Sequence, residues 1–504
     1  MKTRWKVLIA VGIFLALLAG SLLVTAHLQP DNALEAYKKT LCDKGEKLEV
    51  GEVLPPPVAP EQNCVDAVEL AFGAPGSASV KIPHEMQMVA PGKAMIGWRQ
   101  PDARGSDFTN SWEDFSAEAA TYRPTIELLL QVFDRPKLDF QLDYKKGFTM
   151  LLPHLAPFKR TAQVLTAATL CDLHNGDTGA ATTNLCTLLA LVRGNEDERT
   201  IISQLVRIAM LAMAEGANWE LLQSTNATDA QLAALQKNWE QMNFFRSAEQ
   251  SFSMERAMIQ DAIEKARASN EDFDRAFAHP VGTPAGGSSW PNLDEVKFGV
   301  GKVLWRASWS YTEELHVLRG DQIILETLRT MKTNQFLMAD YDSMMSRLSS
   351  LGFTNTGEAL VRALDIPDFR EQFDARSLSG TVKKTMQIEA ARRVIVTALA
   401  LKRFQLKHGK WPETLGELAP ELFPSVPIDP FDGKPLRYHP NADGTFLLYC
   451  VGEDGVDDGG DSTPASPSMS STLAGWFWQR ARDWVWPQPA TPAEVQFFYE
   501  HPPK

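Results

Sequence analysis

Residues 157–192 read PFKRTAQVLTAATLCDLHNGDTGAATTNLCTLLALV and set the fold class. On both sides of Asn175-Gly176-Asp177, apolar residues recur at the three- and four-residue steps of an amphipathic helix. Gly176 suits the left-handed position that ends a helix, and Asp177 belongs to the residue types that begin one. The stretch therefore predicts two helices joined by a tight turn.

The helical pattern continues toward the C-terminus. Residues 195–198 (Asn-Glu-Asp-Glu) place acids in a predicted first turn, and the helix that follows runs to Leu222. Thr228 predicts another helix start, and the signal extends to about Ser269. One unit is similar to a tetratricopeptide repeat, but a stable array needs about three copies. We predict a mainly α protein with a helical-hairpin body over 125–380, with a tetratricopeptide-like arrangement as an alternative.

The C-terminal part has a different character. Residues 386–408 predict an amphipathic helix with an apolar stripe opposite a basic face. Asp432-Gly433 and Asp443-Gly444 predict hairpin turns, with strands at 436–439 and 445–451. Glycine, proline, aspartate, leucine and aromatic residues recur at fixed spacing after this helix: Gly409, Trp411, Pro412, Leu415, Leu418, Asp429, Pro430, Gly433, Pro435, Tyr438, Tyr449, Gly452, Asp454 and Gly455.

This motif string, over about 385–461, resembles the globular domain of the major pseudopilins of type II secretion. The resemblance implies a small α+β domain over 381–465, with a long helix, a short helix and a small antiparallel sheet. It also implies calcium bound by the acidic loop, because carboxylates in a glycine-rich loop suit Ca²⁺. A solvated acidic turn is the alternative. The aspartates at the matching positions are Asp454, Asp457, Asp458 and Asp461.

One departure from the pseudopilin pattern limits what the resemblance implies. In pseudopilins the membrane helix joins this domain directly, whereas here the corresponding helix lies near residue 386, far from the N-terminal apolar run. Assembly into a pilus-like filament is therefore not implied.

The N-terminus predicts export. An apolar run from Val7 to Ala26 is long enough to span a bilayer core of about 30 Å. We predict a membrane anchor over 1–30, and a cleaved signal ending near Val24-Thr25-Ala26 is the alternative. Basic residues precede the run and stay in the cytoplasm in both cases, so we expect a single-pass bacterial inner-membrane protein with its body in the periplasm. These basic residues are Lys2, Arg4 and Lys6.

Three further segments resemble a family of membrane-anchored bacterial envelope proteins that has no assigned activity. They are Lys44-Gly45-Glu46, the run Pro55-Pro56-Pro57-Val58 with Asn63, and Ile202-Ser203-Gln204-Leu205-Val206-Arg207. The resemblance implies architecture only. We predict residues 31–124 as an extended, mixed region with a proline-rich strap or spacer.

Composition excludes one class of partner. The formal net charge is −13, and no basic run follows the N-terminus, so we expect no nucleic-acid partner.

In an oxidising compartment, Cys42 with Cys64 and Cys171 with Cys186 are plausible disulfide pairs, and Cys450 would then be unpaired. Five buried reduced thiols are the alternative.

No catalytic signature is present. The chain lacks Gly-x-Ser-x-Gly, His-Glu-x-x-His, a Walker loop and a dinucleotide-binding fingerprint. Cys171-x-x-His174 has no second ligand pair, so we interpret it as two residues near a helix end. We interpret Glu313, Glu314 and His316 as a solvated helix face, because neighbouring carboxylates point in different directions.

The tail, 466–504, contains Trp476, Trp478, Trp484 and Trp486. We predict that it folds back and buries these rings, because its prolines argue against a long amphipathic helix. A membrane-interface belt is the alternative.

Together, the anchor, the helical hairpins and the lack of catalytic motifs predict an interaction or scaffold protein of the bacterial cell envelope with a protein partner. An extracytoplasmic enzyme of the hydrolase class, with an unrecognised site in the helical body, is the alternative.

Overall fold

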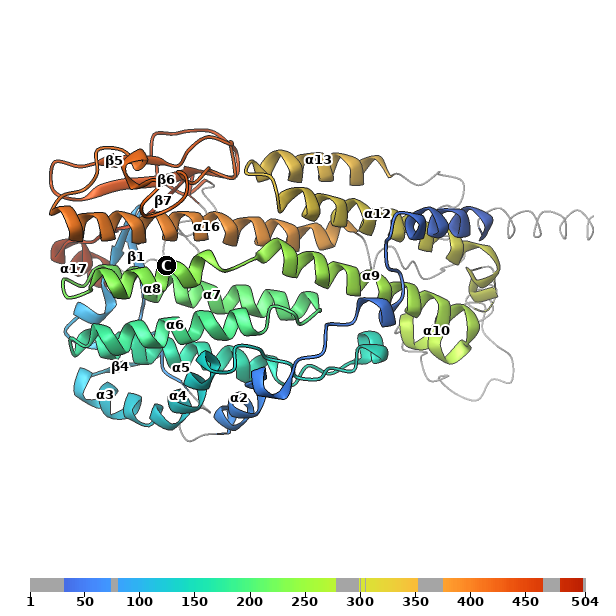
Figure 1. The fold of residues 1–504 in the computed structure, drawn as a ribbon, viewed down its shortest axis with the longest axis horizontal. Helices are drawn as coiled ribbons and strands as arrows, with labels where there is room; N and C mark the ends of the chain where they lie inside the picture. Colours follow the sequence, from blue (N-terminus) through green and yellow to red (C-terminus); the bar gives the residue numbers. More distant parts are fainter. Residues whose placement is uncertain are drawn as a thin grey trace, which may run out of the picture.

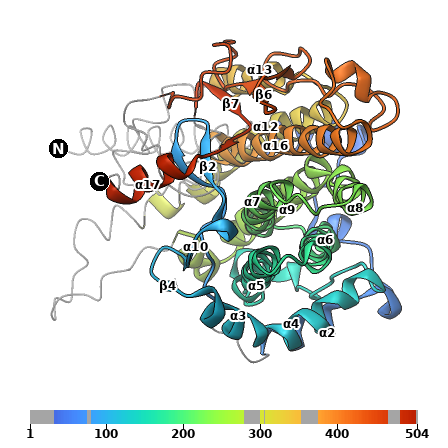
Figure 2. The ribbon, with the colours of Figure 1, turned by 90° about the vertical axis from the view of Figure 1, so that its left-hand side faces the viewer.

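The computed structural model describes residues 31–73, 80–277, 299, 301–303, 305–351, 375–465 and 481–501. In these ranges the chain is mainly helical, which confirms the mainly α part of the predicted fold class. The helices follow the long axis of an elongated molecule (Figure 1), and in the end-on view they stack in layers below a small sheet (Figure 2). The predicted anchor, 1–30, lies outside these ranges, and none of the helices within them is long and apolar enough to cross a membrane.

The predicted helical hairpins are present. Asp177 caps the second helix of the first hairpin, because its side chain accepts a hydrogen bond from the Ala180 N–H. The helix start predicted at Asn195 is wrong: the N-cap is Thr200, and residues 195–198 form a polar turn ahead of it. The helices of the body are α5 (Leu155–His174), α6 (Thr178–Gly194), α7 (Ile201–Leu222), α8 (Asp229–Glu240), α9 (Phe244–Ala268), α10 (Asn270–Phe277), α12 (Ser310–Met331) and α13 (Leu337–Ser350).

The long helix α16 (Ala375–His408) is amphipathic, as predicted, and also central. The basic residues of its predicted polar face are partly or fully exposed, whereas between Ile388 and Leu401 every residue except Arg392 and Arg393 is buried. The helix is enclosed because α7, α8, α9, α12 and α13 all pack on it, together with the small sheet. Both arginines pair with Glu389 of the same helix, at 2.7 and 2.9 Å.

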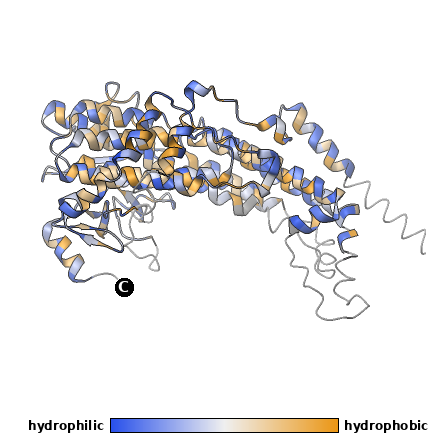
Figure 3. Ribbon diagram, turned by 90° about the horizontal axis from the view of Figure 1, so that it is seen from below, coloured by the Kyte–Doolittle hydropathy of each residue, from blue (hydrophilic) through white to orange (hydrophobic). Residues whose placement is uncertain are grey.

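The helical body and the C-terminal segment share one hydrophobic core. Leu188 and Trp219 of the body belong to the same buried cluster as Ile395 of α16 and Leu448 of the sheet. The predicted units 125–380 and 381–465 therefore do not form separate cores, since α16 contributes apolar side chains to both. In Figure 3 hydrophobic and hydrophilic segments alternate along the helices, as expected for helices that pack on one another.

The small sheet agrees with its predicted strands and adds a third. β5 (Arg437–Pro440) and β6 (Phe446–Val451) are antiparallel, and the turn between them contains Gly444 at φ +84°. The tail supplies β7 (Asp483–Val485), which pairs antiparallel with β6. Trp484 and Trp486 are 0% and 3% exposed, which confirms fold-back for these two rings, whereas Trp476 and Trp478 lie outside the described residues.

The tail then continues across a second sheet. β8 (Gln488–Pro489) pairs parallel with β2 (Lys93–Met95), and α17 (Pro492–Glu500) follows. The short helix implied by the motif string is present as η7 (Leu415–Leu418), with a capping box between Thr414 and Glu417.

The N-terminal region combines short helices with short strands. Residues 31–43 are helical, and the proline-rich strap, residues 54–60, runs along the body rather than standing off it as a spacer. The other elements are η1 (Val50–Val53), η2 (Pro60–Gln62), α2 (Val65–Phe72), β1 (Gln87–Ala90), η3 (Gly97–Arg99), β3 (Ala103–Arg104), β4 (Thr109–Asn110), α3 (Trp112–Ala120), α4 (Arg123–Leu129), η4 (Leu130–Phe133) and η5 (Tyr144–Thr149).

Glu46 fastens this region to α9 and α12. Its carboxylate accepts hydrogen bonds from Arg256 Nη2 at 3.0 Å, Gln322 Nε2 at 3.0 Å and both terminal nitrogens of Arg329. Burial raises the pKa of Glu46, but hydrogen bonds from Arg329, Gln322 and Arg256 outweigh it and lower the pKa to about 2. Glu46 is therefore a charged anchor between distant parts of the chain.

Glu220 of α7 holds the β1–β2 hairpin. Its Oε1 accepts the N–H groups of Met86 and Gly97, at 2.8 and 2.9 Å. Burial raises the pKa of Glu220 to about 8, although these backbone hydrogen bonds act in the opposite direction.

We expect stability to fall as pH rises from about 5 to 8. Glu220 keeps its proton in the folded chain up to about pH 8, whereas an unfolded glutamate loses it near pH 4.3. The folded state thus binds more protons in this window, and raising the pH favours unfolding. Melting temperatures measured across the window should decline, and the decline should be smaller in Glu220→Gln. A slope in Glu220→Gln equal to that of the exposed control Glu69→Gln would contradict this assignment.

Candidate functional site

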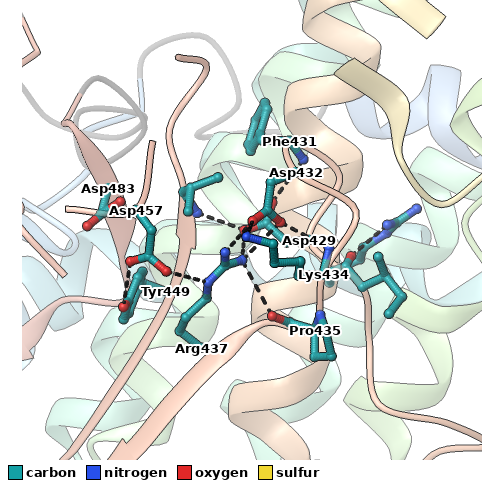
Figure 4. A network of polar contacts seen from close by, with 12 residues as sticks. Asp429, Phe431, Asp432, Lys434, Pro435, Arg437, Tyr449, Asp457 and Asp483 are labelled. Atoms are coloured by element: carbon teal, nitrogen blue, oxygen red, sulfur yellow. Dashed lines mark hydrogen bonds and ion pairs between the residues drawn. The ribbon is translucent and has the colours of Figure 1, made fainter. Parts of the chain in front are cut away.

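The turn at residues 428–435 is built around Asp429 (Figure 4). Its carboxylate is fully buried and accepts hydrogen bonds from the N–H groups of Phe431 at 2.9 Å and Val451 at 2.8 Å. Arg437 Nη1 donates to the same carboxylate at 2.8 Å. Burial raises the pKa of Asp429 to about 7. Asp429 thus joins the turn to the end of β6, which gives the Asp-Pro pair of the motif string a structural role.

Arg437, the first residue of β5, holds further carboxylates (Figure 4). Its Nε lies 3.0 Å from Asp457 Oδ2, and its Nη1 lies 3.1 Å from Asp432 Oδ1. The hydrogen bond with Asp432 raises the pKa of Arg437 above its ordinary range. For Asp432, burial raises the pKa but the bond from Arg437 outweighs it, so the pKa is lowered. The guanidinium group of Arg437 therefore donates hydrogen bonds to three carboxylates, those of Asp429, Asp432 and Asp457.

The aspartates predicted to bind calcium make mostly local contacts within the acidic loop. Asp457 also accepts hydrogen bonds from more distant residues, from Arg437 and from the Tyr449 hydroxyl, both at 3.0 Å. The side chain of Asp458 is exposed. Three of the aspartates accept from the backbone N–H two residues on: Asp454 from Val456 at 3.1 Å, Asp457 from Gly459 at 3.1 Å and Asp461 from Thr463 at 2.9 Å. Asp461 also lies 3.6 Å from Arg482 Nη1.

Asp483 of β7 organises this loop from inside. Its Oδ2 accepts the N–H groups of Gly460 at 2.7 Å and Asp461 at 3.1 Å, and its Oδ1 lies 3.4 Å from the Asp458 nitrogen. Asp483 is 0% exposed, and burial raises its pKa. Backbone amides that converge on one point form an anion-binding concavity, and here the anion is a side chain of the same protein.

The arrangement of the loop does not test calcium binding. In the described part of the chain, no three Asp, Glu, His or Cys side chains gather as a group that could hold a metal. Arg437 already neutralises Asp457. Calcium binding by Asp454, Asp457, Asp458 and Asp461 stays a prediction, and a binding measurement has to test it.

A thermal melt of the full-length chain in calcium and in EDTA separates the two accounts of this loop. We expect Asp483→Asn to lower stability by about 2 kcal/mol in both solutions, because the amide cannot replace a carboxylate that accepts three N–H groups. A calcium-dependent rise in melting temperature that is lost in Asp454→Ala/Asp458→Ala would instead support the metal site.

A second candidate site lies under the proline-rich strap. A narrow cleft, partly open to solvent and with room for about one water molecule, separates the strap from the body. Pro55, Pro56 and Val58 form one wall, and Glu198 lies among the residues opposite. We call this feature the Glu198 cleft. Its remaining lining residues are Lys137, Leu138, Asp139, Phe140, Leu142, Tyr144, Gly194 and Asp197.

Glu198 is held by donors from three elements. Nε2 of His154, the N-cap residue of α5, lies 3.0 Å from both carboxylate oxygens. Asn195 Nδ2 donates at 2.9 Å, and the Ser203 hydroxyl of α7 also contacts the carboxylate. The His154 ring stacks on Phe140 with 4.2 Å between centroids. The Glu198 side chain is 4% exposed, so its orientation is fixed.

Two of the three segments that carry the envelope-protein resemblance meet at this cleft. The strap forms a wall, and Asn63 fixes the opposite segment through two hydrogen bonds to the backbone of Asp139, at 3.0 and 3.2 Å. Ser203 contacts the Glu198 carboxylate, and Gln204 donates to the Glu198 carbonyl at 2.8 Å. Lys44-Gly45-Glu46 docks elsewhere, on α9 and α12.

The predicted solvated face at Glu313 and Glu314 is wrong. Both side chains are 0% exposed. Glu313 accepts from Trp305 Nε1 at 2.7 Å, and Glu314 pairs with Lys38 at 2.6 Å and with Arg267. The N-terminal helix supplies Lys38, so the sequence of α12 alone could not indicate that this face is covered.

Cys171 and His174 have separate partners. Cys171 Sγ lies 3.3 Å from the Ser116 hydroxyl, whereas His174 stacks on Trp112 with 4.2 Å between centroids. All five cysteines are free thiols in this structure, and Cys42 alone among them is exposed.

Sequence reasoning missed Glu198, His154 and Asp483. His154 lies 44 positions from Glu198, and Asp483 lies 22 positions from Asp461. No periodicity relates residues at such separations. The available signal was the polar run 195–198, which we interpreted as a helix start.

Comparison with models of protein families finds no match, and comparisons with curated proteins and with solved structures find no similar protein.

Proposed function

We propose that this chain is a scaffold or interaction protein of the bacterial cell envelope, anchored in the inner membrane by residues 1–30, with its body in the periplasm and a protein partner there. The observation that carries the proposal is the layout of the body. The helix at 31–43 lies near one end of the long helical stack, and the sheet of β5, β6 and β7 lies near the other (Figure 1). In such a layout, the end of the body with the sheet lies far from the end that follows the proposed membrane anchor, and this sheet end is free to contact a partner.

The length of α16 supports this layout. The helix has 34 residues, which corresponds to about 50 Å at 1.5 Å per residue. Leu34 and Leu41 of the N-terminal helix pack on Leu315 and Leu318 of α12, so this helix is part of the folded body.

The pseudopilin resemblance of residues 385–461 is part of the proposal. The chain order α16, η7, β5 and β6 is the order that the resemblance implies, and the acidic loop after β6 presents the exposed side chain of Asp458. One feature differs from a self-contained module: the third strand, β7, comes from the tail. We propose this end of the body as a docking surface for the partner.

Cysteine labelling tests the location of the body. Cys42 is exposed and the other four cysteines are buried, so a membrane-impermeant maleimide reports on one site. We expect full-length protein to be labelled in intact spheroplasts, and Cys42→Ser to abolish the signal. Labelling that requires lysis would place the body in the cytoplasm and overturn the proposal.

Partner capture tests the interaction itself. A photo-crosslinking residue at exposed Asp458 is expected to give a specific adduct in cells. The matched control is the same residue at exposed Glu61, beside the strap. Equal adduct patterns at both positions would count against the docking surface.

A second candidate, an extracytoplasmic hydrolase, is favoured by one observation: a hydrogen-bonded His154–Glu198 pair borders a cleft. Ser203, however, contacts Glu198 rather than His154, so the contact between nucleophile and base of a serine hydrolase is not made. Covalent labelling of Ser203 by a fluorophosphonate, lost in His154→Ala, would favour the enzyme.

A further inference from the structure

Two acids meet where the β1–β2 hairpin rests on α7. Glu85 lies just before β1, and Glu220 lies in the last turn of α7. A Cβ on Gly216 of α7 would lie 2.8 Å from Glu85 Cγ and 3.2 Å from Glu85 Cδ, so the Glu85 side chain packs directly on this helix. Gly216 and Glu220 are four residues apart and are therefore neighbours on one helix face. Both carboxyl groups thus lie between the hairpin and the same face of α7.

The two acids differ in their hydrogen bonds. The Glu220 carboxyl is 0% exposed and accepts the N–H groups of Met86 and Gly97, at the two ends of the hairpin. Glu85 Oε2 is also buried, but it has no hydrogen-bond partner within the described ranges. A buried charged oxygen without a donor is costly, whereas a protonated carboxyl carries no charge. The interface therefore suits Glu85 in its protonated form.

Repulsion between the two acids acts in the same direction. Burial and, after it, the charge of Glu220 raise the pKa of Glu85 well above its ordinary range. Burial also raises the pKa of Glu220 to about 8, although its backbone hydrogen bonds and Arg99 act in the opposite direction. Ionisation of both acids would place two like charges at a buried interface, where they repel more strongly than in water.

The charged groups packed around the pair have other contacts. Arg99 attracts Glu220, but its guanidinium donates to the Gln223 carbonyl. Burial lowers the pKa of His84, so this imidazole is neutral near pH 7. Glu215, beside Gly216 on α7, is a further buried acid. The groups on the neighbouring elements are His174, whose Nδ1 lies 2.9 Å from the Trp98 carbonyl, Lys93, which pairs with Glu494 at 3.6 Å, and Arg104, which lies over the Tyr499 ring.

The hairpin in turn holds the tail. The N–H groups of Gln488 and Ala490 donate to carbonyl groups of the hairpin, at 2.9 and 2.8 Å. Trp219 of α7 adds a contact, because its Nε1 donates to the Pro487 carbonyl at 2.9 Å. The helix α17 packs on β1. Movement of the hairpin away from α7 would therefore remove the partners of both β8 and α17.

We propose that Glu85 and Glu220 form a pH-sensitive latch, which holds the β1–β2 hairpin and the tail on α7 while at least one of the two acids is protonated and opens when both are ionised. Opening releases β8 and α17 together with the hairpin, whereas the helices of the body stay folded. The latch is a conformational device in addition to the proposed scaffold function, and it operates in the isolated chain without a partner.

The direction of the pH dependence follows from proton binding. In the open form water surrounds both acids, and glutamates in water lose their protons near pH 4.3. The closed form keeps these protons to higher pH, so each pH unit above this value favours opening by up to about tenfold for each acid. For Glu220 this dependence ends near pH 8, where the closed form also loses the proton.

Hydrogen exchange of the full-length chain between pH 5 and pH 8, read by mass spectrometry, tests the latch. Protection factors correct for the intrinsic pH dependence of exchange and report how often each segment opens. We expect the protection factors of residues 84–98 and 486–491 to fall together, by at least about tenfold from pH 6 to pH 8. Both segments should remain less protected than α6, because they open while the body stays folded.

Matched variants identify the acids responsible. The double variant Glu85→Gln/Glu220→Gln keeps the shape of both side chains and an acceptor oxygen on each, but it cannot ionise, so the fall in protection should disappear. The exposed control Glu69→Gln and the neighbouring control His174→Gln should both keep the fall of the wild type. If the double variant does not fold, Glu85→Gln alone leaves the hydrogen bonds of Glu220 in place and should reduce the fall.

Three results would overturn the proposal. Protection factors of 84–98 and 486–491 that stay constant from pH 6 to pH 8 would show that no latch opens. A fall of wild-type size in the glutamine variants would assign it to other groups. A hairpin and tail as strongly protected as α6 would show that they open only when the whole body unfolds.

Discussion

Glu46→Ala is expected to be among the most destabilising single substitutions in this chain. It leaves Arg256, whose side chain is 1% exposed, without its carboxylate, and it also removes the acceptor of Arg329 and Gln322. Removing one partner of a buried ion pair costs about 3–5 kcal/mol. We expect a melting temperature lower by several degrees, and faster tryptic cleavage at Lys38, Lys39 and Lys44, because the N-terminal segment loses its attachment.

The matched control is Glu61→Ala, which removes an exposed glutamate from the same region. It should change stability by no more than about 0.5 kcal/mol. Glu46→Gln should lie between the two, since the amide keeps one acceptor oxygen. A Glu46→Ala chain that melts with the wild type would show that the three donors find other partners.

Gly452→Ala is expected to separate the tail from the small sheet. A Cβ at this position would lie 2.0 Å from the Arg482 carbonyl oxygen, a backbone atom that cannot move alone. β7 would have to leave β6, which exposes Trp484 and withdraws Asp483 from the acidic loop. We expect a loss on the order of 3 kcal/mol, the scale of overpacking in a closed site. Tryptic cleavage at Arg482 should accelerate.

Gly51→Ala is the matched control, because a Cβ there would meet nothing within 4 Å. It should leave both the melting temperature and the cleavage at Arg482 unchanged. Wild-type stability of Gly452→Ala would mean that the contact between the end of β6 and the tail is looser than the 2.0 Å approach indicates.

Both substitutions act on contacts between distant segments, and this is where sequence reasoning had least to offer. The helical hairpins, the turn at Asp443-Gly444 and the strands β5 and β6 were predictable, because the residues that specify them lie within a few positions of one another. The helix start at Asn195 failed for the opposite reason. The Glu198 side chain is buried and contacts His154 and Ser203. The helix begins only after its N-cap residue, Thr200.

The same contrast applies to the candidate sites. An acidic glycine-rich loop is visible in the sequence, and the resemblance implied calcium there. The partner that organises this loop, Asp483, comes from a tail strand whose position follows from the packing of Trp484 and Trp486. A local pattern of aspartates carries no information about such a partner.

By itself, the sequence determined the helical class, the first hairpin with its turn at Asn175-Gly176-Asp177, and the strands β5 and β6, because helix and strand periodicity and turn chemistry are local. Only the tertiary structure decided that α16 is a shared central helix, that the strap closes a cleft over Glu198, and that Glu46 and Asp483 anchor the two ends of the chain. The physical reason is that these features depend on burial and on hydrogen bonds between residues many positions apart. Their energies arise only once packing excludes water and brings the partners together.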